Sequence, residues 1–346
     1  AVAAGGAAVG VLLGGILTQY LDWRWNFFVN VPVGIAVTYF SLRLLPEHES
    51  EAEHSNLDLP GAILGTGGLM MLVYALVKAP NMGWTDATTL TFFAISFIAL
   101  AAFIYNEAKT KYPLMPLHLF KIRNLVGADS MMLFLTAGMF SIFFFTTLYL
   151  QEVLGYTPIK TGVSFLIIPI VIAIVATNVP RVIQKIGYKP ILIVAPLFVS
   201  AGLFYLSHIP VNGTFWGNVA PGMVIMALGM GATFVSVTIA ATSGVPHDES
   251  GVASGLLNTS QQVGGAIGLA VLTGIATSAS AEYLKNLSLQ AKPTGEQLAA
   301  ATVHGFHEGY LIASTFGIVA SLIAIFVIKQ GKVSKEDFSP EKMVAG

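Results

Sequence analysis

The sequence predicts an all-α polytopic membrane protein, and three observations support that prediction. Only 10% of its 346 residues are charged, and 55% are hydrophobic. Its mean hydropathy is +0.74, whereas an average soluble domain carries about 25% charged residues. Apolar stretches of about twenty residues, the length that crosses a bilayer as a helix, alternate with short polar turns along the chain. Lipid must therefore solvate most of the surface of this protein.

Ten apolar stretches are long enough to be membrane-spanning helices. In chain order we expect them at residues 1–21, 27–45, 58–79, 88–108, 124–150, 159–180, 190–208, 218–243, 252–279 and 306–328. The longest connections are then residues 46–58 and 280–305. Because the chain begins at an alanine inside the first apolar stretch, we also expect further sequence upstream of residue 1.

The distribution of basic residues predicts the orientation, because cytoplasmic loops carry an excess of Lys and Arg. One side of the predicted topology holds segments 43–57, 109–123, 181–189 and the tail after residue 328, with twelve of the 17 basic residues. The other side holds Arg24, Lys78, Lys160, Lys285 and Lys292. We therefore expect a multi-pass protein of the cytoplasmic membrane with its C-terminus in the cytoplasm. The four tryptophans fall on the outer side, as interfacial aromatic residues do.

Several function classes lack support in the sequence. A net charge of −1 gives no attraction to nucleic acid, and the lack of cysteine excludes disulfides and thiolate metal sites. No H-E-x-x-H, G-x-S-x-G or G-x-x-x-x-G-K-[ST] segment occurs, so neither an enzyme nor an ATP-driven pump is predicted. No cofactor is expected, and His304 and His307, three residues apart, are on their own a weak indication of a metal site.

The first apolar stretch is crowded with small residues, among them Gly10, Gly14 and Gly15. Small residues let two helix backbones approach closely in lipid, where no hydrophobic force drives helices together. Two interpretations remain open. The stretch forms either a tight, static helix crossing or a crossing that slides or loosens during gating.

Three segments near the N-terminus are spaced as a helix, an outer turn and the start of a second helix: GVLLGG at 10–15, WRWNF at 23–27 and NVPVG at 30–34. Together they resemble helix five and the start of helix six of the major facilitator superfamily, and more narrowly its fourteen-helix drug:proton antiporters of the EmrB/QacA type. The first segment resembles the antiporter motif G-P-x-x-G-G, with Val11 where the family has Pro. The candidate motif residues are Gly10, Gly14 and Gly15 in the helix, and Trp23, Arg24, Trp25, Asn30, Pro32 and Gly34 in and after the turn.

Four further segments match the same family, at 57–61, 113–124, 149–162 and 251–268, so the resemblance covers essentially the whole chain. It implies a major facilitator fold of which helices 5–14 of fourteen are present. Residues 1–45 would be the last two helices of the N-terminal six-helix bundle, and 46–108 a cytoplasmic loop with two inserted linker helices. Residues 109–328 would be the C-terminal six-helix bundle, and 329–346 a disordered cytoplasmic tail.

The resemblance also implies a function. It is that of a proton-coupled secondary transporter that exports small amphipathic or cationic drugs by alternating access. The expected partners are the lipid bilayer, the amphipathic substrate and protons, with a periplasmic adaptor if the source is a double-membrane bacterium. The proton gradient would supply the energy.

Ionisable side chains inside membrane helices are costly and usually functional. Asp129 is either a proton- or cation-binding group or an interfacial carboxylate paired with Arg123 or Lys121. The aromatic residues of span 124–150 either face lipid or line a drug pocket. A neutral polar stripe on span 252–279 either bonds a neighbouring helix or lines a wet cavity. The candidate cavity residues are Met139, Phe143, Tyr149, Asn258, Gln261 and Gln262.

Three other functions remain as alternatives. A nutrient or metabolite uniporter or importer would share the same fold. A non-transporting membrane scaffold would need a folded domain outside the membrane, for which the loops are short. A membrane-embedded enzyme would need His, Asp or Glu clustered at one depth, and the sequence has no such cluster.

Overall fold

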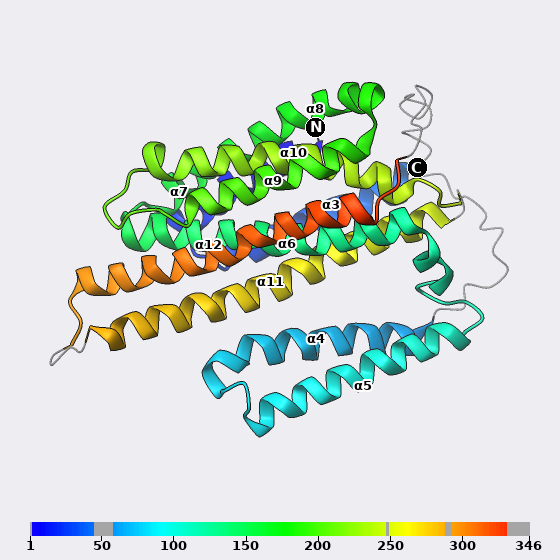
Figure 1. Cartoon of the computed structure of the whole chain (residues 1–346), viewed down its shortest axis with the longest axis horizontal. Helices are drawn as coiled ribbons and strands as arrows, with labels where there is room; N and C mark the ends of the chain where they lie inside the picture. Colours follow the sequence, from blue (N-terminus) through cyan, green and yellow to red (C-terminus); the bar gives the residue numbers. More distant parts are fainter. Residues whose placement is uncertain (1, 45–57, 247–248, 288–291, 331–346) are drawn as a thin grey trace.

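The computed structural model describes residues 2–44, 58–246, 249–287 and 292–330 (Figure 1). Helices dominate these residues, and none of them lies in a β-strand. Within these ranges, nine helices are long and apolar enough to cross a membrane. The first predicted span forms a shorter apolar helix, Gly5–Tyr20, inside α1 (Val2–Tyr20). The prediction of an all-α polytopic membrane protein is confirmed, whereas the predicted loop 46–57 and tail 331–346 lie outside the described residues.

The second half of the chain forms one helical bundle (Figure 1). Its helices are α6 (Arg123–Leu148), α7 (Pro158–Phe165), α8 (Ile167–Ile186), α9 (Tyr188–Leu206), α10 (Ala220–Thr242), α11 (Ser250–Asn286) and α12 (Gly295–Phe326). α6 contacts α10, α11 and α12, and α9 packs against α10 and α12. The core therefore lies around α6, where Phe145, Tyr149 and Tyr310 are almost completely buried.

Glycines let the bundle helices approach each other closely. A methyl group at Gly264 of α11 would collide with the carbonyl oxygen of Leu133 on α6. One turn later, a methyl group at Gly268 would collide with Ala137 of α6. Backbone-to-backbone packing of this kind replaces the hydrophobic force that lipid does not supply.

The predicted span 159–180 is divided into two helices. α7 ends at Phe165, Leu166 forms a turn, and α8 begins at Ile167. Pro169 explains the break, because it lacks the N–H that would bond the carbonyl of Phe165. Two π-helical turns add further irregularity, η2 (Tyr149–Val153) after α6 and η3 (Phe215–Val219) before α10.

The bounds differ most from prediction where α11 and α12 meet. Segment 280–305, expected as a connection, is mostly helical, since α11 continues to Asn286 and α12 begins at Gly295. Thr294 starts α12 through a capping box with Gln297. With 37 residues, α11 is about 55 Å long, well beyond the hydrocarbon core of about 30 Å. We call this end of the molecule outer, following the predicted orientation.

Two helices, α4 (Leu59–Met82) and α5 (Ala87–Lys109), form a hairpin beside the bundle (Figure 1). They pack on each other, and α4 also contacts α11. Asp58 caps α4 by accepting the N–H of Gly61 at 2.9 Å, and Asp86 caps α5 by accepting the N–H of Thr88 at 2.8 Å. Trp84 lies in the outer turn between the two helices.

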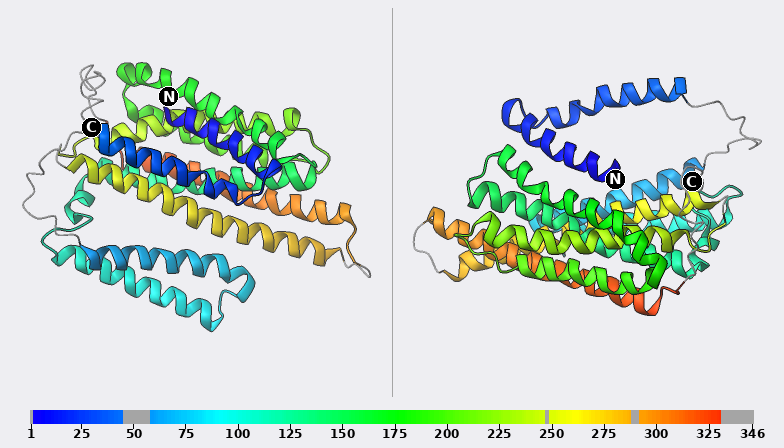
Figure 2. Two further views of the ribbon diagram at one scale, coloured as in Figure 1. Left: turned by 180° about the vertical axis from the view of Figure 1, so that it is seen from behind. Right: turned by 90° about the horizontal axis from the view of Figure 1, so that it is seen from above.

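The N-terminal segment touches the bundle through one helix. α1 packs against α7 and α8, and α2 (Trp25–Phe28) turns the chain into α3 (Asn30–Leu44). α3 leads away from the bundle (Figure 2), and apart from half-buried Ser41 its residues are exposed. The crossing of α1 with α7 is therefore the place to examine the predicted motif residues.

Candidate functional site at the α1–α7 crossing

Two glycines bring α1 and α7 into backbone contact. A methyl group at Gly15 of α1 would lie 2.9 Å from the carbonyl oxygen of Pro158. A methyl group at Gly162 of α7 would lie 3.0 Å from the carbonyl oxygen of Val11. A methyl group at Gly15 would force the two backbones apart, and one at Gly162 would fit only if the backbone of Val11 gave way slightly, so the crossing at this spacing favours glycine on both helices.

The three motif glycines of α1 have different surroundings. Gly15 makes the contact with α7. Gly14 faces the outer turn, because a methyl group there would lie 3.5 Å from Oδ1 of Asn26. Gly10 has open space around it, with no atom of a neighbouring segment within 4 Å of where its methyl group would be.

Gln19 extends the crossing toward the outer end of α7. Its Oε1 accepts a hydrogen bond from the backbone N–H of Ile159 at 3.2 Å. The first N–H groups of a helix have no partner within the helix, and Thr157 accepts another of them, from Lys160, at 3.3 Å. α1 thus helps to cap α7. Gln19 was not among the predicted site residues, although its position four residues after Gly15 places it on the same helix face.

The outer turn folds back onto α1 through Asn26. Its Nδ2 donates to Oγ1 of Thr18 at 2.8 Å. Asn30 in turn donates to the carbonyl oxygens of Asn26 at 3.0 Å and Phe27 at 3.4 Å. These carbonyls belong to α2, next to the break at Val29, and Pro32 lies in the first turn of α3, where the N–H that it lacks has no partner within the helix. Asn26 links the turn to the crossing and is a second residue absent from the predicted set.

The remaining motif residues of the turn and of α3 lie outside the crossing. Trp23 and Trp25 are 57% and 47% exposed, as interfacial anchors are. Arg24 pairs with Asp22 at 3.0 Å and lies over the Trp23 ring. Gly34 has open space around it.

A cavity of about 260 Å³ adjoins the crossing, between α1, the outer turn, α6 and α7. Phe143 of α6 stacks on Phe165 of α7 at its wall, with ring centroids 5.4 Å apart. Thr161 also lines the cavity, and its hydroxyl is buried without a hydrogen-bond partner among the described residues. The cavity therefore combines an aromatic wall with an unused polar group.

Asp129 lies on α6, the helix that carries Phe143, but far from this cavity. It precedes Phe143 by fourteen residues, about 21 Å along α6. Its side chain is 9% exposed, and Oδ1 has no hydrogen-bond partner in the part of the chain described. The ion pair considered with Arg123 or Lys121 is not formed, because Arg123 instead donates to the carbonyl oxygens of Val327 and Phe326 at the end of α12.

Of the predicted cavity residues, only Phe143 lines this cavity. Tyr149 lies elsewhere: it is fully buried in the bundle, and its hydroxyl donates to the carbonyl oxygen of Pro210 at 2.6 Å. Met139 packs against the core. Asn258 and Gln262 are exposed on α11 and Gln261 is half-buried, so among the described residues no neighbouring helix covers the polar stripe.

Comparison with known proteins gives the family. The profile of the Major Facilitator Superfamily matches residues 1–269. The puromycin resistance protein pur8 of Streptomyces alboniger is 34% identical over 93% of this chain and 63% of that protein. The tetracenomycin C resistance and export protein of Streptomyces glaucescens is 34% identical over 77% of this chain and 49% of that protein.

A third relative, the cephamycin export protein CmcT of Amycolatopsis lactamdurans, is 35% identical over 81% of this chain and 59% of that protein. The chain thus spans less than two thirds of the length of each of these relatives. The profile match covers more than half of the chain and agrees with the bundle of membrane-length helices. The chain is a multi-pass membrane protein that belongs to the Major Facilitator Superfamily.

Proposed function

We propose that this chain acts in a secondary transporter that exports small amphipathic or cationic drugs across the cytoplasmic membrane in exchange for protons. The observation that carries the proposal is the α1–α7 crossing, because it joins the N-terminal helices to the bundle through close backbone contacts at Gly15 and Gly162. The resistance and export proteins at 34–35% identity support the substrate class.

Alternating access requires helix bundles to rock around a site near the bilayer midplane. A crossing with no side chains between its backbones suits such movement, because α1 can change its angle on α7 without repacking interlocked side chains. The break at Leu166 gives the α7–α8 segment a place to bend. The cavity beside the crossing would then be the outer part of the substrate path.

Proton coupling needs a group that binds and releases a proton within the membrane. Asp129 is the candidate, because it is buried in α6 and none of the cations described forms an ion pair with it. An ionisable residue in such a position is functional by default. Its distance from the cavity means that coupling would act through α6 and not through contact with the drug.

The subfamily, the orientation of the C-terminus and an adaptor are further parts of the proposal. The α4–α5 hairpin lies beside the bundle, which supports the fourteen-helix EmrB/QacA type with residues 46–108 inserted between two bundles. The excess of basic residues supports a cytoplasmic C-terminus. A periplasmic adaptor remains a partner to test in a double-membrane host.

Everted membrane vesicles that carry the full-length protein test this function directly. We expect ethidium to accumulate when a proton gradient is imposed and to leak out when a protonophore collapses it. The Asp129→Asn variant should lose the gradient-driven part of the accumulation. The matched control is Glu152→Gln, because Glu152 is an exposed carboxylate in η2, and it should behave like the parent protein.

Two results would contradict the proposal. Ethidium flux that is indifferent to the protonophore would indicate a uniporter. Full gradient-driven accumulation by Asp129→Asn would remove Asp129 as the coupling group while leaving the export function in place.

A further inference from the structure

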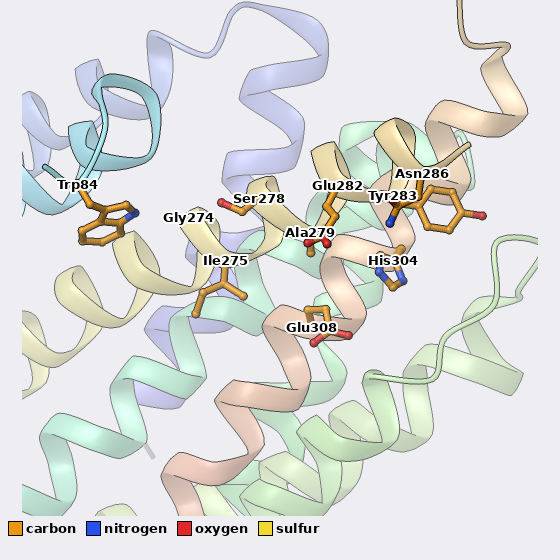
Figure 3. Close-up of a pocket in the computed structure, with 10 residues that line it drawn as sticks. All are labelled: Trp84, Gly274, Ile275, Ser278, Ala279, Glu282, Tyr283, Asn286, His304 and Glu308. Atoms are coloured by element: carbon orange, nitrogen blue, oxygen red, sulfur yellow. The ribbon is translucent and has the colours of Figure 1, made fainter. Parts of the chain in front are cut away.

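A second and larger cavity lies at the outer end of the molecule, away from the α1–α7 crossing. Its volume is about 640 Å³, and it is bordered by α11, α12 and the turn of the α4–α5 hairpin. Figure 3 shows Glu282 and Tyr283 projecting from α11, His304 and Glu308 from α12, and Trp84 at the opposite end. No predicted site residue lines it.

The charge of this cavity is negative. Its two charged lining residues, Glu282 and Glu308, come from different helices. In the described ranges neither carboxylate accepts a hydrogen bond or forms an ion pair. Lys285, the next basic residue along α11, does not line the cavity. Two unpaired carboxylates beside one space favour a cation there.

Aromatic side chains supply the rest of the recognition surface. The rings of Tyr283 and His304 lie 5.0 Å apart between centroids. Trp84 is 52% exposed, so part of its indole ring is free to contact a ligand. Aromatic faces attract organic cations, and aromatic side chains are used to recognise quaternary ammonium groups.

The cavity is also polarised along its length. Gly274 and Asn286 line its two ends, twelve residues or about 18 Å apart on α11. Trp84 and Ile275 lie toward one end of the cavity and Glu282 toward the other, with Glu308 between Ile275 and Glu282 (Figure 3). This arrangement fits an elongated molecule with a cationic head and an apolar chain.

We propose that this outer cavity binds organic ammonium compounds, with the ammonium head at Glu282 and Glu308 and an apolar chain directed along Ile275 toward Trp84. The amine of a phosphatidylethanolamine lipid and a free cationic amphiphile share this chemistry. The site differs from the cavity at the α1–α7 crossing, and its test does not depend on transport.

Quenching of Trp84 by a brominated ligand measures both affinity and orientation. Trp23, Trp25 and Trp216 are replaced by Phe in the full chain in dodecyl maltoside, which leaves Trp84 alone of the four tryptophans. The probe is (11-bromoundecyl)trimethylammonium, whose bromine is at the end of the chain away from the ammonium. The matched probe 11-bromoundecanoate has a similar chain and a negative head.

We expect saturable quenching by the ammonium probe and little by the carboxylate probe. Glu282→Gln with Glu308→Gln should weaken binding of the ammonium probe by about tenfold, because it removes both charges while keeping side-chain shape. The control pair Glu152→Gln with Glu296→Gln changes the net charge equally at exposed positions outside the cavity. It should leave the binding curve unchanged.

Competition by short-chain lipids distinguishes the two sources. If dioctanoyl-phosphatidylethanolamine displaces the probe from the parent protein and the phosphatidylglycerol analogue does not, the site takes a lipid amine. If neither competes while the charge dependence holds, it takes free cationic amphiphiles. The proposal is overturned if quenching does not saturate, if both probes quench equally, or if the Glu282/Glu308 variant binds like the control pair.

Discussion

At the scale of single residues, Gly15 is the position where one added methyl group has the largest expected effect on α1. That methyl group would lie 2.9 Å from the carbonyl oxygen of Pro158, whereas the same group at Gly10 would meet open space. Gly15→Ala should therefore weaken the crossing by about 1–3 kcal/mol. Gly10→Ala should be neutral or slightly stabilising, because alanine favours helix more than glycine does.

The absence of cysteine makes this prediction measurable. Cysteines at Gln19 and Ile159, which are hydrogen-bonded across the crossing, can be joined by a short bis-maleimide reagent. We expect Gly15→Ala to lower the cross-linking yield and Gly10→Ala to leave it unchanged. Equal yields in both variants would mean that Gly15 does not set the spacing of α1 and α7.

Residue type and spacing predicted part of this site. The glycines of α1 predicted a close helix crossing, because helices in lipid need small residues where their backbones meet. Gly15 forms this close contact with α7. Gln19 and Asn26 escaped prediction, because their roles depend on hydrogen bonds to residues that only the folded chain brings near. The position of Tyr149 in the packed core was not predictable for a related reason: an aromatic residue in an apolar span has no pattern that separates a cavity wall from a packed core.

At the scale of helices, a buried carboxylate holds the hairpin to the segment that enters the bundle. Glu107 at the end of α5 is 3% exposed, and its Oε2 accepts the backbone N–H of Met115 at 2.8 Å. Its other oxygen, Oε1, is buried and has no hydrogen-bond partner among the described residues. Glu107→Ala leaves a part-buried N–H of Met115 without its partner, a cost of about 1–3 kcal/mol.

Trypsin reports on this junction, because Lys111 lies between Glu107 and Met115. We expect Glu107→Ala to speed cleavage after Lys111, since segment 110–116 loses its anchor. Glu107→Gln should cleave at the parent rate, because the amide oxygen can still accept the N–H of Met115. If both variants are cleaved at the same rate, the hydrogen bond does not hold the segment.

The outer end of the same hairpin should respond to acid. The pKa of Asp86 lies below its ordinary value because its carboxylate accepts a hydrogen bond from the backbone N–H of Thr88. Such a group stabilises the start of α5 above its ordinary pKa of about 3.9, and this contribution is lost as the pH falls through the lower folded value. Trp84 emission in the protein with Trp84 alone should therefore change only below about pH 4. Asp86→Asn, which still caps the helix, should remove that change, and its persistence would exclude Asp86 as the source.

The length of each apolar stretch predicted that a helix would form there, but it did not always predict where the helix would end. The apolar stretches expected at 252–279 and 306–328 end before the helices do, because α11 continues to Asn286 and α12 already begins at Gly295. The break at Leu166 was hidden in a uniformly apolar stretch. There the signal was Pro169 alone, and many membrane helices tolerate a proline with only a kink.

At the scale of the whole molecule, the inner end of the bundle is tied together independently of α1. Lys329, just after α12, donates its backbone N–H to Oδ1 of Asn124 on α6 at 2.8 Å. Tyr188 at the start of α9 donates to the carbonyl oxygen of Lys329 at 3.0 Å. The bundle should therefore move as a unit, and movement should be concentrated where α1 meets α7.

Reversible cross-links test that division of rigid and moving parts. A disulfide-containing cross-linker between cysteines at Gln19 and Ile159 should stop ethidium transport, because it fixes the angle between α1 and α7, and reduction should restore it. The same cross-linker between cysteines at Asn124 and Lys329 should leave transport intact, since both positions belong to the bundle. Transport that continues with the α1–α7 link in place would show that the crossing is static. A loss of transport in the second protein would mean that α6 and α12 also move, and that the bundle does not rock as one body.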